Sequence, residues 1–304
     1  MTLLLLGAGG QLGHELRRTL APLGELMVAT RSGELDAGAA CLAADLAEPR
    51  SLARALDQAR PRLIVNAAAY TAVDRAEDEP ALADRVNHLA VAEIGAWAAA
   101  NGAQVIHYST DYVFDGTSPR PYREDDPTAP LGVYGATKLA GEHALRASGA
   151  RHWIFRTAWV YAARGHNFLR TMLRLAGERD ELRVVADQIG TPTPARWIAG
   201  VTAAALGRGA HTDSGIWHVT AGGQCSWHEF ASAIVAGAAA RGLIARAPRV
   251  TAIRTADYPT RARRPAYSVL DCTKLATMLG LQWPHWRAEL AAILDEIAAT
   301  PSLN

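Results

Sequence analysis

The first half of the chain alternates short apolar runs with longer amphipathic stretches. The runs that predict buried strands are Leu3–Leu6, Leu26–Ala29, Cys41–Ala43, Leu63–Val65, Gln104–Ser109 and Trp153–Thr157. Between them, apolar residues recur at helical spacing through Leu12, Leu16 and Leu20, from Pro49 onward, over Pro80–Ala100 and over Tyr134–Ala147. Strands that alternate with helices of this length predict βαβ units, and therefore a parallel sheet with helices on both faces.

After about Tyr161 this alternation loosens. Helical patterns at Phe168–Ala176, Trp197–Leu206, Glu229–Ala240 and Trp286–Ile297 are separated by connections rich in Pro, Gly and Thr. The pattern predicts an α/β protein: a doubly wound parallel sheet over residues 1–160 and a smaller mixed α/β domain over residues 161–304. We expect some segments of the second region to return to the sheet.

Composition narrows the class of protein. The 304 residues carry 31 Lys and Arg against 30 Asp and Glu, and this balance argues against a nucleic-acid binder, which would show a basic excess. The three cysteines stand far apart, which argues against a disulfide scaffold or a zinc module and fits a reducing compartment. Apolar runs stay well short of the roughly 18 residues that a membrane span requires. We therefore expect a cytoplasmic protein with no membrane partner.

A glycine-rich loop joins the first predicted strand to the first helix. Its glycines Gly7, Gly10 and Gly13 follow a G-x-x-G-x-x-G spacing instead of the G-x-G-x-x-G of the standard dinucleotide fingerprint. Such a loop lets the backbone approach a pyrophosphate, which then faces the positive end of the helix. The loop predicts a Rossmann-type dinucleotide-binding domain, and it leaves open a plain strand-to-helix turn.

The end of the second strand indicates which dinucleotide binds. An NAD site places a carboxylate there for the ribose 2′-hydroxyl, whereas an arginine suits the 2′-phosphate of NADP. This chain has Thr30, Arg31 and Ser32 at that point, which favours NADPH and leaves NADH open. Asp45, after the third strand, would lie beside the adenine.

A phenol and an ammonium stand four residues apart, at Tyr134 and Lys138, on one face of a predicted helix. At about 4 Å and an effective dielectric constant of about 20, a lysine charge stabilises a phenolate by about 4 kcal/mol. That would lower the phenol pKa from about 10 by some two to three pH units. Thr110 ends the fifth strand at the carboxyl edge and can donate a hydrogen bond to a carbonyl beside Tyr134. Thr110, Tyr134 and Lys138 are therefore the predicted catalytic residues.

With the glycine loop, these residues resemble the extended short-chain dehydrogenases/reductases, and within them the dTDP-4-dehydrorhamnose reductase family. The segments that carry the resemblance are Gly7–Gly13, Asn66–Asp74, His107–Asp115, Tyr134–Glu142, Phe155–Tyr161, Asp187–Thr193 and Arg264–Pro265. The resemblance covers nearly the whole chain, and it assigns the second domain to the nucleotide-sugar substrate.

The residue patterns above and the resemblance together predict two groups of binding residues. The cofactor group comprises Gly7, Gly10, Gln11, Leu12, Thr30, Arg31, Asp45, Leu46, Ala67, Ala69, Tyr70, Thr71, Tyr134 and Lys138. The substrate group comprises Val73, Thr110, Asp111, Trp159 and Arg264, the last for the substrate pyrophosphate. Trp159 as a core residue and Arg264 as a solvated loop residue remain alternatives.

Some members of this family are described as bridging subunits through Mg²⁺ held by acidic side chains. Glu15 matches one such position, but Arg196 stands where another acid is expected. We therefore predict no metal site and leave Mg²⁺ dependence and a homodimer open.

The resemblance implies an NADPH-dependent reductase of the C4 ketone of dTDP-4-dehydro-L-rhamnose, the last step of dTDP-L-rhamnose synthesis, with Tyr134 as proton donor. One alternative is another nucleotide-sugar enzyme, an epimerase or a dehydratase. A dehydratase would follow Asp111 with a glutamate, and here Tyr112 follows. The other alternative is a regulatory subunit that binds the cofactor without catalysis.

Overall fold

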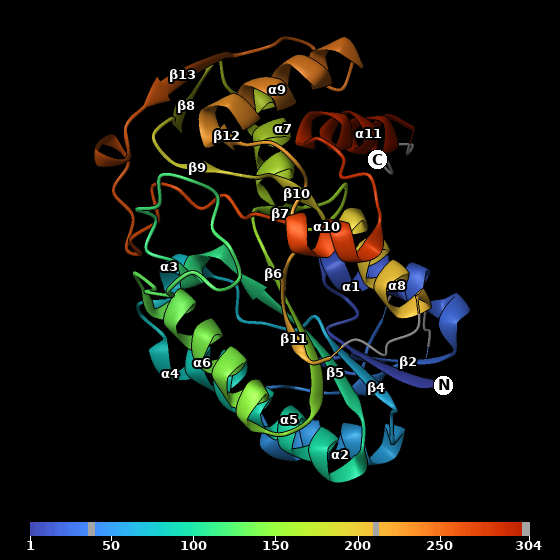
Figure 1. Ribbon diagram of the computed structural model, residues 1–304. Helices are drawn as coiled ribbons and strands as arrows, with labels where there is room; N and C mark the ends of the chain where they lie inside the picture. Colours follow the sequence, from blue (N-terminus) through green and yellow to red (C-terminus); the bar gives the residue numbers. More distant parts are fainter. Residues whose placement is uncertain (36–39, 209–212, 300–304) are drawn as a thin grey trace.

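The computed structural model describes residues 1–35, 40–208 and 213–299. Within these ranges, seven parallel strands form one sheet (Figure 1). From edge to edge they are β11 (Gly215–His218), β6 (Arg151–Thr157), β5 (Gln104–Thr110), β4 (Leu63–Asn66), β1 (Thr2–Leu6), β2 (Glu25–Thr30) and β3 (Leu42–Ala43). The predicted doubly wound parallel sheet is confirmed. β11 is the strand of this sheet that apolar patterning alone did not reveal, because only Ile216 and Trp217 in it are strongly apolar.

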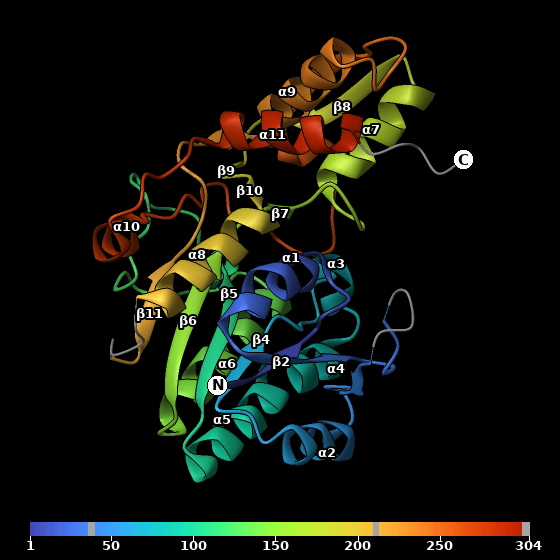
Figure 2. The same ribbon diagram turned by 90° about the vertical axis from the view of Figure 1, so that its right-hand side faces the viewer.

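Helices cover both faces of the sheet (Figures 1 and 2). Leu4 and Leu6 of β1 face a core shared with α2 (Pro49–Ala59), α5 (Ala90–Asn101) and α6 (Val133–Ala147). Leu3 and Leu5 face the opposite core, shared with α1 (Gln11–Leu20), α8 (Ala195–Gly207) and α10 (Thr273–Leu279). Because successive side chains of a strand alternate between faces, a strand buried on both faces is apolar at every position, as Leu3–Leu6 is.

The helix expected over Pro80–Ala100 consists of three consecutive segments. α4 (Pro80–Asp84) leads into a π-helical stretch at Arg85–Leu89, and α5 continues from Ala90. Single π turns inside longer helices often occur at functional sites. This one carries Asn87, whose side chain is buried and reaches the segment after β4.

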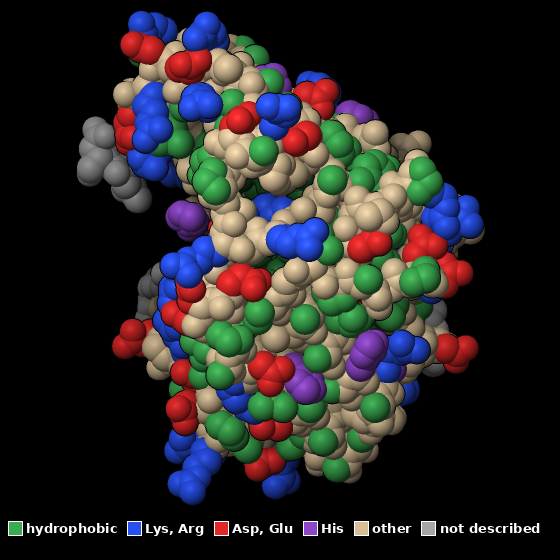
Figure 3. Space-filling view, turned by 90° about the vertical axis from the view of Figure 1, so that its left-hand side faces the viewer, with side chains coloured by type: hydrophobic (Ala, Val, Ile, Leu, Met, Phe, Trp, Pro, Cys, Tyr) green, Lys and Arg blue, Asp and Glu red, His purple; other side chains and the backbone are tan. Residues whose placement is uncertain are grey.

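A second core lies above the carboxyl edge of the sheet, in the upper lobe of Figure 1. It is built from α7 (Phe168–Glu178), α9 (Trp227–Ala240), α11 (Trp286–Ala299), β8 (Glu181–Val185) and β13 (Arg249–Ile253). The remaining short elements are α3 (Val73–Ala76), β7 (Val160–Tyr161), β9 (Ile189–Gly190), β10 (Thr193–Pro194), β12 (Cys225–Ser226) and single 3-10 turns at Ala21–Leu23, Asp111–Val113 and Thr255–Asp257. Figure 3 shows a recess in the surface between the two lobes, with Lys or Arg side chains at its rim.

Among the described residues, no helix is both long enough and apolar enough to cross a bilayer.

Candidate active site

All seven strands of the sheet run in the same direction, so their carboxyl ends share one edge. The glycine loop follows β1, Arg31 follows β2, Ala67 follows β4 and Thr110 ends β5. This edge is where ligands bind in open α/β sheets. The topology therefore brings the cofactor and catalytic residues expected from the sequence to one edge.

The glycine loop is shaped for a close backbone approach. Gly7 has a φ of +80°, and a Cβ there would lie 2.7 Å from the amide nitrogen of Ala68. A Cβ at Gly13 would collide with the Gly7 carbonyl oxygen, so α1 packs directly against the loop. Gly10 precedes α1, and Gln11 and Leu12 form its first turn. The N-terminal turn of α1 therefore directly follows the glycine loop, as a pyrophosphate site at the positive end of the helix requires.

The residues after β2 and β3 form the neighbouring part of the edge. The Thr30 hydroxyl accepts from Gly33 N and donates to Glu34 O, which shapes the turn that follows β2. The Arg31 side chain in that turn is exposed. The Asp45 carboxylate accepts from Ala47 N at 2.9 Å, and Leu46 is buried in the core.

The segment after β4 is held by the π turn. The Asn87 amide accepts from Tyr70 N at 2.9 Å and donates to Tyr70 O at 3.1 Å. Ala67, Ala69 and Tyr70 are partly exposed and Thr71 is exposed, so a ligand at this edge of the sheet could reach this segment. The Tyr70 hydroxyl donates to Glu79 at 2.5 Å.

Tyr134 lies in the first turn of α6, next to Thr110 at the end of β5. Thr110 is buried; its hydroxyl donates to Asp111 Oδ1 at 3.0 Å and accepts from Tyr112 N at 3.1 Å. Burial raises the pKa of Tyr134 to about 12; a hydrogen bond with Thr110 lowers it and the Asp111 charge raises it. The expected net lowering of the Tyr134 pKa is wrong for the free protein, because burial outweighs every other contribution.

Lys138 is fully buried one helical turn further along α6. Its Nζ donates to the carbonyl oxygen of Tyr108 at 2.6 Å and lies 3.2 Å from His107 Nε2. Burial lowers its pKa to about 8, although the nearby Glu142 charge acts in the opposite direction. The lysine therefore sits behind the phenol in a dry site, where its charge depends on pH near neutrality.

Asp111 is also buried beside this pair. Burial raises its pKa to about 6, against the hydrogen bonds from Thr110 and Ser268. A carboxyl group that titrates so near neutrality can be a donor or an acceptor toward a sugar hydroxyl.

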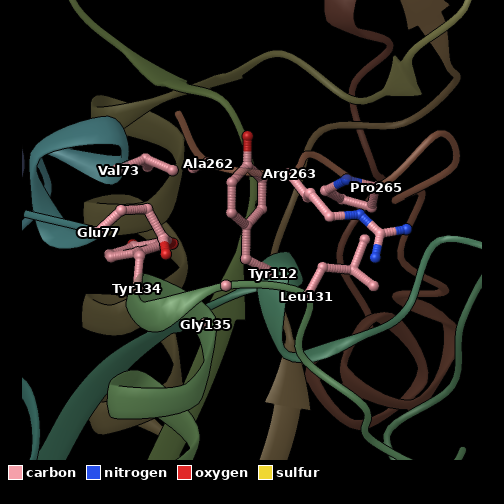
Figure 4. A pocket seen from close by; sticks show the side chains of 10 residues that line it. Val73, Glu77, Tyr112, Leu131, Tyr134, Gly135, Ala262, Arg263 and Pro265 are labelled. Carbon is pink, nitrogen blue, oxygen red and sulfur yellow. The ribbon is translucent and has the colours of Figure 1, made fainter. Parts of the chain in front are cut away.

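A small hollow opens next to Tyr134 (Figure 4). It is lined by α3 and the residue that follows it, by Tyr112 just after β5, by the start of α6, and by the loop at residues 262–265. The lining residues are Val73, Glu77, Tyr112, Leu131, Gly132, Tyr134, Gly135, Ala262, Arg263 and Pro265. The rings of Tyr112 and Tyr134 meet edge to face, with centroids 5.7 Å apart. Val73, expected near the sugar, lies in this wall.

Arg264 and Trp159 are held by other protein groups. Arg264 pairs with Asp74 at 2.7 Å, which ties the loop around residue 264 to α3. Trp159 follows β6 in a left-handed conformation with a φ of 47°, and it stacks on Trp227 with ring centroids 3.4 Å apart. Backbone strain of this kind tends to occur at binding sites, where the surrounding structure stabilises it.

Glu77 and Tyr112 are among the lining residues that were not predicted as site residues from the sequence. The Glu77 carboxylate accepts from Val133 N at 2.8 Å and so caps the helix that carries Tyr134. This contact spans 56 positions, and no local pattern signals it. Tyr112 could have been found, because it directly follows Thr110 and Asp111 at a strand end.

The two positions weighed for a metal are engaged in ion pairs. Glu15 is buried and pairs with Arg18 at 3.3 Å, and Arg196 pairs with Glu289 at 3.1 Å. Across the part of the chain that the structure describes, no cluster of three or more His, Cys, Asp or Glu side chains could hold a metal ion.

Comparison with known proteins gives consistent matches over nearly the whole chain. Residues 1–299 match the family model described as RmlD substrate binding domain. A dTDP-4-dehydrorhamnose reductase of Burkholderia thailandensis is 49% identical over 298 residues, which cover 94% of this chain and 96% of that protein.

Two solved structures of reductases with this name are also similar. The Clostridium acetobutylicum structure has a TM-score of 0.87 and 34% identity, covering 98% of this chain and 99% of the other. The Bacillus anthracis structure, solved in complex with NADP, has a TM-score of 0.86 and 33% identity, covering 97% and 98%.

Proposed function

The chain belongs to the RmlD substrate binding domain family, whose members include dTDP-4-dehydrorhamnose reductases, and from this membership we propose that it reduces the C4 ketone of dTDP-4-dehydro-L-rhamnose with NADPH. The product would be dTDP-L-rhamnose. The observation that carries the proposal is the convergence of the glycine loop, Thr110, Tyr134 and Lys138 at one edge of the sheet.

The residues at this edge fit NADPH. A Cβ at Gly7 or Gly13 would collide with neighbouring backbone atoms, so glycine at both positions lets the loop pack tightly against the segment after β4 and against α1. In a Rossmann-type site the pyrophosphate binds at such a loop. Arg31 is exposed after β2, where its planar guanidinium can pair with a 2′-phosphate. The buried hydroxyls of Ser109 and Thr157, at the ends of β5 and β6, have no hydrogen-bond partner within the described residues. Unpaired buried hydroxyls of this kind need a partner outside the protein, such as a bound ligand or an ordered water. When bound, NADPH supplies the hydride that reduces the ketone.

Tyr134 is the proposed proton donor. A phenol whose pKa lies near 12 is protonated at neutral pH, so the acid form is ready before reaction. An alkoxide is more basic than a phenolate, and the proton therefore moves from Tyr134 to the C4 oxygen as negative charge develops there. The Lys138 ammonium stabilises the Tyr134 phenolate that remains. The Thr110 hydroxyl orients the C4 oxygen of the sugar.

Tyr112 supports a reductase over a dehydratase. Elimination of water from a sugar requires a second acid or base beside Asp111, and the neighbouring position carries a phenol. Burial and the Asp111 charge raise the pKa of that phenol, so it stays protonated near neutral pH and cannot accept a proton from the sugar.

The proposal is tested with purified protein, dTDP-4-dehydro-L-rhamnose and either NADPH or NADH. We expect loss of nicotinamide absorbance, faster with NADPH, and dTDP-L-rhamnose as the product identified by NMR. Absence of cofactor oxidation, or a different sugar product, would overturn the proposed function.

A further inference from the structure

A row of three buried polar side chains lies behind Tyr134. Asn66 at the end of β4, His107 on β5 and Lys138 on α6 are each about 1% exposed. Asn66 and His107 are register partners on adjacent strands, so their side chains lie next to each other. The Asn66 Nδ2 to His107 Nδ1 distance is 3.1 Å, and the His107 Nε2 to Lys138 Nζ distance is 3.2 Å.

The backbone fixes the orientation of the Asn66 amide. The Ala68 N–H donates to Asn66 Oδ1 at 3.2 Å. A rotated amide would turn its NH₂ group toward that N–H, and two donors cannot bond each other. Asn66 Nδ2 therefore donates to His107 Nδ1, and this ring nitrogen carries no proton.

His107 is held neutral by its surroundings. Burial lowers its pKa well below the ordinary value, and a charge on Lys138 lowers it further. A neutral imidazole without a proton on Nδ1 carries its proton on Nε2. The Nε2–H group then faces Lys138 Nζ. An ammonium at Nζ has only donors and cannot accept this hydrogen bond, whereas an amine can accept it through its lone pair.

We propose that Asn66 and His107 are positioning residues that act through Lys138: the oriented imidazole presents its Nε2–H to Nζ and biases the lysine toward the uncharged amine. The catalytic consequence rests on the proposed function: the bias sets the fraction of the free enzyme in which Lys138 is the ammonium that stabilises the Tyr134 phenolate. Asn66 is itself tied to Ala68, in the segment proposed to contact the cofactor. The charge of Lys138 is thereby connected to that segment by a continuous chain of hydrogen bonds.

Other charged groups around Lys138 do not replace this effect. Glu142 lies one turn further along α6 and favours the ammonium, but it is itself paired with Arg156 of β6 at 2.7 Å. Tyr134 lies one turn earlier and is neutral in the free protein. Asn87 and Thr137, which bond each other between the π turn and α6, carry no charge. His107 is the titratable group that β5 presents to Nζ.

The protonation of Lys138 can be measured directly, because the chain contains only two lysines, Lys138 and Lys274. Labelling lysine with ¹³C at Cε gives two resonances whose pH titrations are followed by NMR, without substrate or cofactor. Lys274 is exposed and serves as the internal control, and Lys138→Met assigns the signals. We expect the Lys138 midpoint to lie well below the ordinary pKa of a lysine, because its ammonium is buried.

Replacing the imidazole should reverse the bias. In His107→Leu the Lys138 midpoint should rise by about one pH unit, a roughly tenfold change in the protonation constant, while Lys274 stays unchanged. His107→Gln, whose side-chain amide can turn its oxygen toward Nζ, should also raise the midpoint and serves if the leucine variant does not fold. An unchanged or lower Lys138 midpoint in a folded variant would overturn the proposal, because it would show that His107 only packs in the core and does not disfavour the ammonium.

The tautomer of His107 gives a second readout. In ¹⁵N-histidine protein, the resonance lost in the His107 variant should show a bare Nδ1 and a protonated Nε2; a protonated Nδ1 would overturn the proposal. In Asn66→Asp the carboxylate should draw the proton to Nδ1, and the Lys138 midpoint should rise. If the protein proves inactive on the nucleotide sugar, these titrations still decide the hydrogen-bond chain. If it is active, the alkaline limb of kcat should move with the NMR midpoint.

Discussion

Replacing Lys138 with methionine should stabilise the fold while removing activity. The ammonium is buried, and its pKa falls from 10.5 to about 8. At about 1.4 kcal/mol per pH unit, protonated Lys138 destabilises the folded chain by about 3 kcal/mol at pH 7. Methionine has a similar length and no charge, but it loses the hydrogen bond to Tyr108 O, worth about 1 kcal/mol. We therefore expect the Lys138→Met variant to be about 2 kcal/mol more stable at pH 7.

The gain should depend on pH in a defined direction. Because the folded-state pKa lies below the unfolded value, the unfolded chain binds the extra proton between about pH 8 and 10.5, and wild-type stability rises through that window. At pH 9.5 the penalty on the wild type falls by about 2 kcal/mol, so the two proteins should then be nearly equal in stability.

Urea unfolding of wild type, Lys138→Met and the control Lys274→Met at pH 7 and 9.5 measures these differences. The control replaces an exposed lysine and should show no such pH-dependent gain. The reasoning fails if Lys138→Met is no more stable than wild type at pH 7, or if its advantage is as large at pH 9.5. The variant should also lose turnover, since methionine cannot stabilise the phenolate.

Two further predictions concern the edges of the site. Arg31→Ser should lower kcat/KM for NADPH at least tenfold and leave kcat/KM for NADH nearly unchanged, because a charged hydrogen bond to a 2′-phosphate contributes about 1.5–3 kcal/mol. Arg50→Ser on α2 is the control for loss of an arginine elsewhere. Equal losses with both cofactors would show that Arg31 does not contact the 2′-phosphate. Glu77→Ala should reduce the free energy of unfolding by about 1 kcal/mol and lower kcat more than it raises KM, because Val133 N–H loses its partner at the start of α6. Glu77→Gln keeps an acceptor oxygen and should restore most of both, and a glutamine variant as impaired as the alanine variant would contradict the capping role.

Much of the sheet could be predicted because its strands are buried on both faces. Leu3–Leu6 and Leu63–Val65 are short continuous apolar runs, and such runs between amphipathic helices have few alternatives. β11 was harder, since Gly215–His218 has only two strongly apolar residues and joins the sheet through a partner about 60 positions away in sequence. The π turn at Arg85–Leu89 cannot be recognised from the apolar periodicity of the helix around it.

The candidate site was predictable where residues follow one another along the chain. Tyr134 and Lys138 share a helix face by spacing alone, and Thr110 is placed by the end of its strand. The electrostatics were not predictable in this way, because the pKa of Tyr134 depends on burial and on Asp111 more than on a lysine four residues away. The partners of Lys138 come from β5, and no spacing along α6 indicates them.

The central claim, that the Tyr134 phenol gives its proton to the ketone oxygen, is tested most directly by Tyr134→Phe. Single-turnover reduction of dTDP-4-dehydro-L-rhamnose and NADPH affinity should be measured on the same preparation. We expect turnover to fall by about 10²–10⁴-fold with NADPH affinity changed by less than a factor of about three. Turnover within a few fold of wild type would contradict the account.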